Sequence, residues 1–278
     1  MKIQVITDST SDIPQDMAEK IGIRVVPIYI RFGDKIYRDG VDMEPGAFYT
    51  RLLESPFHPA TSQPTPEDFE SVYRDYCDSV DGIISIHISS KISGTFNSAN
   101  IAKKNVGSRC PIEVIDSRLN SAGLALAAMN AAAMAKKGEN LSDLADKIRA
   151  GMSRIDMFGF FDTMKYLARS GRVSRTIVAA ASILNVKPLL TFRDGDIVRA
   201  GLVRSVSRGM DRLYKFVQEK RNIAEMIIVH SIIPSQAETL KKRLGGFYPE
   251  DKINIMEMGA GLGVHGGPGV LLVGLREG

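Results

Sequence analysis

A chain of 278 residues is long for a single compact core, so two domains are expected. Its content of 44% hydrophobic and 24% charged residues is ordinary for a folded soluble protein. The formal net charge of +4 is small and the basic residues are scattered, which argues against a nucleic-acid-binding surface.

Short β-rich runs alternate with helical patterns through the first half of the chain. Strands are predicted at residues 2–7, 81–89 and 112–117, and helices at 15–22, 44–55, 94–106, 121–138 and 140–155. A further helix is predicted to begin at Thr65, Pro66 and Asp68, which have the pattern of a capped, proline-started N-terminus. Asp12 is the predicted N-cap of the helix at 15–22. This alternation predicts a doubly wound, mostly parallel sheet.

Residues 23–43 interrupt the alternation. Two β-rich runs flank "FGDK" at residues 32–35, which is the signal of a β-hairpin. The sequence therefore predicts a hairpin inserted into the parallel-sheet domain.

The rhythm changes after about residue 153. Strand-like runs are found at residues 157–162, 186–205, 225–232, 252–259 and 269–275, with helices predicted at 163–184, 207–221 and 234–245. The "RDGD" at residues 193–196 indicates a hairpin turn. We therefore predict an N-terminal α/β domain at residues 1–153 and a C-terminal α/β domain, with a mixed or antiparallel sheet, at residues 154–278.

No membrane-spanning or secretory segment is predicted. The apolar run that opens the chain is too short for a signal-peptide core, and no stretch approaches the roughly 18 apolar residues of a membrane span. Cys77 and Cys110 have neither a metal-ligand spacing nor the pattern of a disulfide framework. These features predict a cytoplasmic protein that is not an integral membrane protein.

Hydroxyl-rich loops follow three of the predicted strands. They are "TDSTSD" at 7–12, "SSKISGT" at 89–95 and "DSRLNS" at 116–121, with a fourth cluster, "TSQPT", on another loop at 61–65. The carboxyl ends of parallel strands share one sheet edge, where ligands usually bind. Ser93, Gly94 and Thr95 would set backbone N–H groups and hydroxyls at a helix start, an arrangement suited to a carboxylate or phosphate. A simpler reading also stands, because the same residue types are favoured helix caps.

Candidate cations come from the second half of the chain. They are Arg169, Arg172, Arg175, Arg199 and Arg204. Each arginine taken alone is more simply a solvated surface residue. His265 lies within the glycine-rich "GAGLGVHGGPGV" and is predicted on an exposed loop, from which it could donate to an anion.

Motifs of several other chemistries are missing. The glycine-rich tail lacks the Gly-Lys-Ser/Thr ending of a nucleotide-binding loop, and no G-x-S-x-G nucleophile elbow occurs. No cluster of histidine, cysteine and carboxylate residues has metal-ligand spacing.

Eight motifs together carry a family resemblance. In chain order they are "TDSTSDIP", "TSQPTP", "SSKISGTFNSA", "IDSRLNSAG", "YLARSGRVS", "KPLL", "VRS" and "VHGGPG". From residue 6 to about residue 270 the sequence resembles the DegV family of bacterial fatty-acid-binding proteins.

The resemblance implies a two-domain α/β protein that holds one fatty acid in a tunnel between the domains. It further implies an acyl carrier, whose bound carboxylate a separate fatty-acid kinase phosphorylates to an acyl phosphate for phospholipid synthesis. The carrier itself would have no turnover and no cofactor, with the long-chain fatty acid as its ligand. Transient membrane contact for lipid exchange is compatible with this role.

The resemblance also implies which residues form the site. Thr61 and Ser93 correspond to the carboxylate ligands. The family's basic residues fall on Arg172, Arg204 and His265, and further pocket positions on Ser62, Gly94, Thr95 and Asn97. A carboxylate in an apolar pocket loses water and needs such donors, while a guanidinium suits a phosphate. Ala168 and Ser170 in "YLARSGR" depart from the usual family pattern but are not proposed ligands.

An enzyme is the alternative hypothesis. A serine-dependent acyl hydrolase or a small-molecule phosphotransferase would use Ser93, with His265 as the attractive base. The missing nucleophile elbow and nucleotide loop weigh against it.

Overall fold

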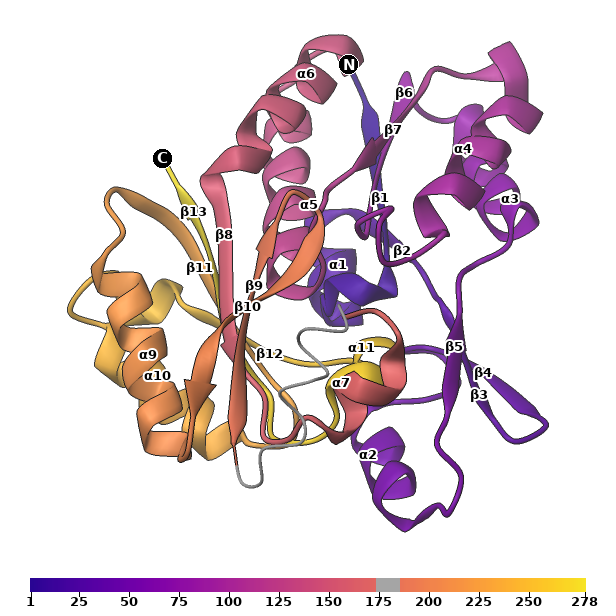
Figure 1. The fold of residues 1–278 in the computed structure, drawn as a ribbon. Coiled ribbons are helices and arrows are strands. Elements are labelled where there is room, and N and C mark those ends of the chain that lie inside the picture. The colour runs from indigo at the N-terminus through magenta and orange to yellow at the C-terminus, as the bar shows by residue number, and fades with distance from the viewer. Residues whose placement is uncertain (174–185) are drawn as a thin grey trace.

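The computed structural model describes residues 1–173 and 186–278, which form three β-sheets with helices around them (Figure 1). The first sheet has the order β2-β1-β6-β7, and all of its strands are parallel. Its strands are β1 (Ile3–Asp8), β2 (Ile23–Val26), β6 (Gly82–His87) and β7 (Ile112–Asp116). Every residue of β6 is buried, because this central strand is covered on both faces. The predicted parallel sheet is confirmed.

Helices cover both faces of this sheet. They are α1 (Gln15–Ile21), α3 (Pro66–Cys77), α4 (Thr95–Val106), α5 (Ser121–Lys136) and α6 (Leu141–Gly151). Aromatic and alanine side chains of α3 and α4 pack on one face, and α5 packs on the other. The predicted capping box of α3 is confirmed, since Thr65 and Asp68 bond to each other's backbone N–H groups.

Asp12 was predicted as the N-cap of α1, and this prediction is wrong. The cap position is Pro14, and Asp12 ends the 3-10 turn η1 (Ser9–Ser11) with a positive φ of 56°. Its carboxyl oxygens accept hydrogen bonds from distant groups, the hydroxyl of Ser121 at 2.6 Å and the backbone N–H of Gly259 at 2.8 Å. Asp12 therefore joins segments that are far apart in the sequence.

The predicted hairpin is confirmed and belongs to a small antiparallel sheet. Its order is β4-β3-β5, with β3 (Tyr29–Phe32), β4 (Lys35–Arg38) and β5 (Ala60–Ser62). Helix α2 (Pro45–Glu54) connects β4 to β5 and buries Phe48, Tyr49 and Leu52. Residues 61 and 62 were predicted on a loop but lie in β5, because Thr61 pairs with Ile30 of β3.

The predicted mixed sheet of the second half is also confirmed. Its six strands have the order β10-β9-β8-β13-β11-β12, and only the β11–β12 pair is parallel. They are β8 (Ile155–Phe160), β9 (Lys187–Arg193), β10 (Asp196–Val203), β11 (Ile223–His230), β12 (Asn254–Glu257) and β13 (Leu271–Glu277). Helices α9 (Val206–Gln218) and α10 (Pro234–Leu244) cover its outer face, as Figure 1 shows. The predicted turn at residues 193–196 joins β9 to β10.

Helix α5 lies between the two large sheets (Figure 1). It packs on β1 and β6 of the parallel sheet and on β8, β11 and β13 of the mixed sheet. Its many alanines allow this close approach, and a Cβ at Gly274 of β13 would lie only 2.6 Å from the Cβ of Ala122. One hydrophobic cluster therefore runs through both halves of the chain. A division at residues 153 and 154 stays a prediction.

Two short helices, α7 (Lys165–Ser170) and α11 (Ala260–Gly266), pack on each other. Helix α7 ends at Gly171, whose φ is 64° and which lies within the helix predicted at 163–184. Residues 174–185, with Arg175 and the rest of that predicted helix, lie outside the described residues. Helix α11 contains His265, which corrects the prediction of an exposed loop.

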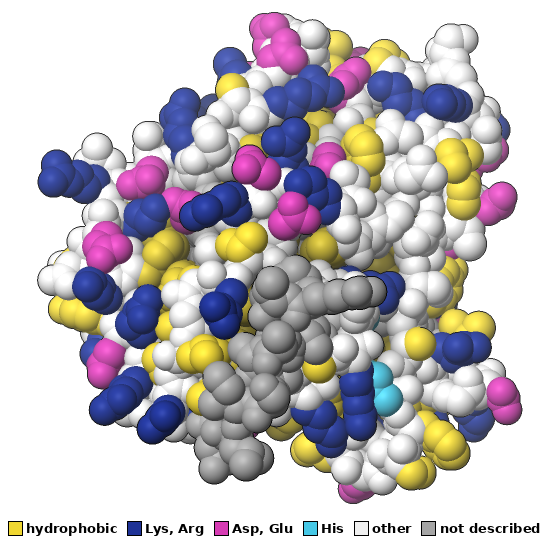
Figure 2. Space-filling view, in the orientation of Figure 1, with side chains coloured by type: hydrophobic (Ala, Val, Ile, Leu, Met, Phe, Trp, Pro, Cys, Tyr) yellow, Lys and Arg dark blue, Asp and Glu magenta, His cyan; other side chains and the backbone are white. Residues whose placement is uncertain are grey.

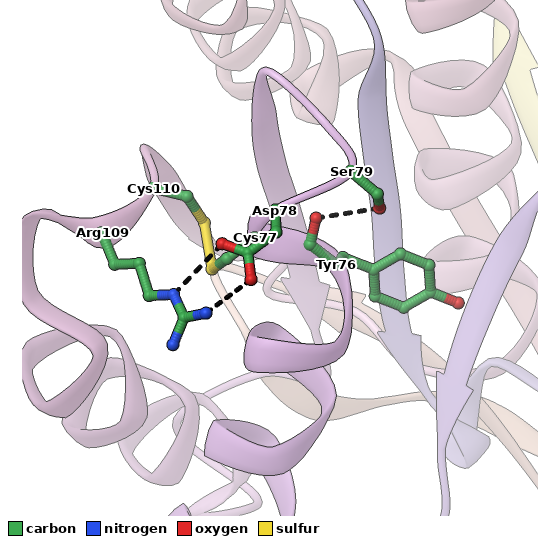
Figure 3. Close-up of a disulfide and its surroundings, with 6 residues drawn as sticks. All are labelled: Tyr76, Cys77, Asp78, Ser79, Arg109 and Cys110. Carbon is green, nitrogen blue, oxygen red and sulfur yellow. Dashed lines mark hydrogen bonds and ion pairs between the residues drawn. A yellow bond between two sulfur atoms is a disulfide. The ribbon is translucent and has the colours of Figure 1, made fainter.

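The two cysteines correct another expectation. Cys77 at the end of α3 and Cys110 just before β7 form a disulfide, with Cα atoms 5.3 Å apart (Figure 3). An ion pair between Arg109 and Asp78 lies beside it. Because Cys110 precedes β7 and α3 leads into β6, the cross-link lies at the amino edge of the parallel sheet.

Gly267 is required for the end of α11. Its φ is +72° and its ψ −173°, and a Cβ there would overlap the ring of Tyr166. We expect Gly267→Ala to lower the free energy of unfolding by roughly 2–4 kcal/mol, from the backbone conformation and the overlap together. Gly46→Ala is the matched control, because a Cβ at this α2 glycine would have no atom within 4 Å and alanine favours helix by about 1 kcal/mol. Urea denaturation of both variants measures the difference, and equal stabilities would contradict the expectation.

Candidate functional site

A polar cavity of about 470 Å³ lies at the carboxyl edge of the parallel sheet. Each of the three predicted hydroxyl-rich loops contributes to its wall, through Thr10, Ser93 and Asn120. Thr61 of β5 and His265 of α11 line it as well. The remaining lining residues are Ile28, Ser62, Gln63, Ile88, Ser90, Lys91, Ile92, Gly94, Arg172, Ile197, Gly261 and Leu262. The predicted convergence of separate loops on one sheet edge is therefore present.

Ser93, Gly94 and Thr95 form the start of α4 at this cavity. The Ser93 and Thr95 hydroxyl oxygens are 2.9 Å apart, and the Thr95 N–H donates to Ser93 Oγ at 3.3 Å. Gln63 packs so closely over Gly94 that its side-chain amide occupies the space of a Cβ, which explains glycine here. A helix start with hydroxyl groups favours an anion in the cavity.

Thr61 and His265, which both line the polar cavity, are in contact with each other. Thr61 Oγ1 and His265 Nε2 are 2.9 Å apart, although 204 positions separate the residues in the sequence. Burial and the charge of Arg172 lower the pKa of His265 to about 4, so the imidazole is neutral near pH 7. His265 Nδ1 is buried and has no hydrogen-bond partner among the described residues. His265 therefore offers a hydrogen-bonding group, not a fixed positive charge.

The predicted basic residues are only partly brought together. Arg172 lines the cavity, and its guanidinium donates to the backbone carbonyl of Ser170 at 2.8 Å. Arg204 is exposed after β10, and Asn97 is exposed on α4; neither lines a cavity found among the described residues. Thr95 contacts Ser93 but does not itself line the cavity. The roles assigned to these residues stay predictions.

An apolar cavity of about 70 Å³ adjoins the polar one. The two share Asn120, Ile197, Leu262 and His265. Its other lining residues are mostly aliphatic and aromatic side chains: Met157, Phe158, Phe161, Leu167, Leu190, Phe192, Met258 and Leu272, with Ser121, Gly159, Thr191 and Gly266. A polar chamber that shares part of its wall with an apolar one suits an amphiphile with an anionic head.

Two buried carboxyl groups hold α11 beside the site. Asp12 accepts a hydrogen bond from the N–H of Gly259 at 2.8 Å, and the carboxyl group of Asp39 lies against Gly259 and Gly261 at the start of α11. Burial raises the pKa of Asp12 to about 8 and that of Asp39 to about 6. These contacts fix the helix that carries Leu262 and His265.

Over the face in Figure 2, Lys and Arg side chains lie scattered among acidic and uncharged ones. Among residues 1–173 and 186–278, no group of three or more histidine, cysteine and carboxylate side chains is placed to hold a metal ion. No helix within these ranges is long and apolar enough to cross a membrane.

Comparison with known proteins identifies the family. The sequence-family model described as "uncharacterised protein, DegV family" matches residues 2–277 of this chain. The chain belongs to the DegV family. A DegV domain-containing protein of Caldanaerobacter subterraneus is 35% identical over 270 residues, which cover 96% of each chain.

Solved structures of DegV proteins share the whole fold. A fatty-acid-binding DegV family protein from Thermus thermophilus is 30% identical, with a TM-score of 0.91 and complete coverage of both chains. DegV of Bacillus subtilis, described as a fatty-acid-binding protein, is 28% identical, with a TM-score of 0.89 and complete coverage of both chains. The predicted family and the two-part α/β fold are thereby confirmed.

Sequence reasoning did not single out several residues that line the polar cavity. Thr10, Gln63, Ser90, Lys91 and Asn120 all lie in the hydroxyl-rich loops or directly beside them. The sequence indicated these loops only by their position after predicted strands. That position does not indicate which side chains of a loop face the cavity.

Proposed function

We propose that this DegV protein binds one long-chain fatty acid, with the carboxylate at Thr61 and Ser93 and the acyl chain entering the apolar cavity between the two halves of the chain, which widens to hold it. The adjoining polar and apolar cavities carry this proposal. Two DegV neighbours are described as fatty-acid-binding proteins, which supports it. Each methylene buried in the apolar cavity contributes about 0.8 kcal/mol to retention.

We further propose that the bound acid is presented to a separate fatty-acid kinase, which forms an acyl phosphate for phospholipid synthesis. Arg172 at the polar cavity has the guanidinium geometry that binds phosphate oxygens in pairs. The protein would act in the cytoplasm, with transient membrane contact for lipid exchange. Acyl phosphate formation that requires ATP, fatty acid, a kinase subunit and this protein together is the expected result.

Co-purified lipid tests the binding proposal directly. Denaturing the purified protein and analysing the released lipid by mass spectrometry should yield one fatty acid per chain. A protein that carries no lipid and takes up no added fatty acid would rule out the proposed function.

Ser93→Ala is expected to weaken fatty-acid affinity roughly tenfold or more, because a hydrogen bond to a charged group is lost. Fluorescent fatty-acid displacement measures the change. Ser79→Ala is the matched control, since Ser79 bonds to the carbonyl of Tyr76 near the disulfide, away from the cavity (Figure 3). Equal affinities of the two variants would contradict the role of Ser93.

The hydrolase alternative receives less support from the geometry. His265 Nε2 forms its hydrogen bond with Thr61, and Ser93 Oγ forms its hydrogen bond with Thr95. These two atoms are therefore not hydrogen-bonded to each other. A hydroxyl nucleophile needs a base within hydrogen-bond reach. Incubation of the protein alone with acyl esters, or with ATP and fatty acid, separates the hypotheses, since turnover without a kinase would favour an enzyme.

A further inference from the structure

Four polar side chains form a buried chain beneath the carboxyl edge of the parallel sheet. The Tyr73 hydroxyl donates to Ser85 Oγ at 2.9 Å, and Ser85 Oγ lies 2.6 Å from His87 Nε2. His87 Nδ1 lies 3.0 Å from Asp8 Oδ2. All four side chains are fully buried. In the neutral tautomer that donates Nδ1–H to Asp8, His87 Nε2 accepts the proton of the Ser85 hydroxyl, whose oxygen accepts from Tyr73.

The serine, histidine and aspartate have the order of a catalytic triad, but their surroundings exclude that role. Ser85 lies within β6, has no exposed surface, and lines neither cavity found among the described residues. A nucleophile must reach its substrate. Buried polar groups in a sheet otherwise packed with isoleucine therefore need another explanation.

Asp8 is the end of the chain that faces the site. Its Oδ1 accepts from the N–H of Thr10 at 3.1 Å and from the Thr10 hydroxyl. Its Oδ2 accepts from the N–H of Ile88 at 3.1 Å and from His87. Thr10 and Ile88 both line the polar cavity. One carboxylate therefore fixes the end of β1 against the end of β6.

The same contacts continue to Ser93. Ile88 precedes Ser89, whose N–H donates to the Leu119 carbonyl at 2.8 Å. The carbonyl of Ser89 accepts a hydrogen bond from the N–H of Ser93 at 3.1 Å. The hydroxyl of Ser89 donates to the carbonyl of Gly195 at 2.7 Å. The position of Ser93 thus depends on a strand end that Asp8 holds.

We propose that Asp8 and His87 are positioning residues of the anion-binding site: they touch no ligand, and they set the loops that bind the ligand's head group. This inference rests on the proposed function, because it takes a fatty-acid carboxylate as that head group. It predicts that the pair controls recognition of the carboxylate and leaves recognition of the acyl chain unchanged.

Asp8→Asn tests the proposal with little change in volume. Each carboxylate oxygen accepts two hydrogen bonds, so either orientation of the amide sets an NH₂ group against two donors. We expect affinity for stearic acid to fall at least tenfold. Affinity for stearyl alcohol, which has the same chain without the carboxylate, should change less than twofold. The ratio of the two affinities is the readout, because general destabilisation would weaken both ligands equally.

A pair of substitutions at His87 gives a second, independent test. Asparagine places an amide N–H near Nδ1, so His87→Asn keeps the donor to Asp8 and should keep the acid-to-alcohol ratio. Glutamine instead places its amide near Nε2, so His87→Gln should lower the ratio at least fivefold. Ser85→Ala removes only the far end of the chain and should leave the ratio unchanged. Urea denaturation of each variant accompanies the binding measurements.

The outcomes separate the two levels of the proposal. A wild-type protein that binds neither ligand would overturn the proposed function and this inference with it. A wild-type protein that binds stearic acid, with Asp8→Asn or His87→Gln variants that keep the acid-to-alcohol ratio, would overturn the positioning role alone. If Asp8→Asn does not fold, the His87 pair decides the question.

Discussion

Reduction of the Cys77–Cys110 disulfide is expected to lower the free energy of unfolding by roughly 3–4 kcal/mol. The two cysteines are 33 positions apart, and a cross-link over a loop of that length removes chain entropy of this size from the unfolded state. Guanidinium denaturation with and without a thiol reductant measures the change. A midpoint that the reductant leaves unmoved would show that the cross-link does not stabilise the fold.

The double variant Cys77→Ala/Cys110→Ala is the control for this experiment. Its stability should not respond to the reductant, which excludes an effect of the reductant itself. Fatty-acid affinity should be the same for the oxidised, the reduced and the variant protein, because the cross-link lies at the opposite sheet edge from the polar cavity. A reducing cytoplasm keeps such pairs as thiols, so the reduced protein is the relevant form for the location we propose.

The free energy of unfolding of the wild-type protein is expected to fall as the pH rises, and Asp12→Asn should abolish most of this fall. Burial raises the pKa of Asp12 from its ordinary value of 3.8 to about 8, and the nearby Asp39 and Asp8 act in the same direction. The folded state therefore stays protonated where the unfolded state has ionised. The stabilisation is complete below about pH 4 and is lost as the pH rises to 8, by up to about 1.4 kcal/mol per pH unit.

The interval from pH 6 to 8 gives the cleanest comparison. Asp39, whose pKa is about 6, contributes with the same sign at lower pH and is retained in the variant. Urea denaturation at half-unit steps should show a falling free energy of unfolding for wild type and a flatter curve for Asp12→Asn. The control Asp42→Asn should follow wild type there, because Arg38 lowers the pKa of Asp42 to about 2. Parallel curves for wild type and Asp12→Asn would contradict the expectation.

The elements that the sequence predicted well have local signals. The capping box at Thr65 and Asp68 and the turn at "FGDK" each lie within a few residues, so their structure follows from short-range preferences. The alternation of strands and helices along the chain was sufficient to predict the parallel sheet. The disulfide and the contacts of Asp12 join distant segments, and no local pattern indicates them.

Helix α11 shows most clearly why a local prediction failed. Its glycines indicated a loop, yet they are helical, and glycine stands at these positions because neighbouring side chains leave no room for a larger residue. A Cβ at Gly263 would lie 2.6 Å from the Phe48 ring, and one at Gly261 would lie 2.7 Å from the Asp39 carboxylate. A helix of seven residues has little stability alone, so its formation depends on packing that one sequence cannot reveal.

The candidate site was predicted in outline. Thr61, Ser93, Arg172 and His265 do line one cavity, whereas Asn97 and Arg204 lie on the surface outside it. Motif order identifies which loops gather, but the direction of each side chain depends on helix phase and strand twist. The ligand role of each residue remains a prediction, and the affinity of Ser93→Ala tests the role of Ser93.

The position of α5 limits how a ligand can enter. A clamshell opening, in which the two sheets swing apart about a hinge, would expose the helix and the side chains of both sheets that bury it. Ala125, Leu126 and Ala128 have essentially no solvent-accessible surface, so such an opening would cost much of the hydrophobic stabilisation of the fold. We therefore expect fatty acid to exchange through small movements of side chains and loops at the cavity, with the two sheets fixed as one body.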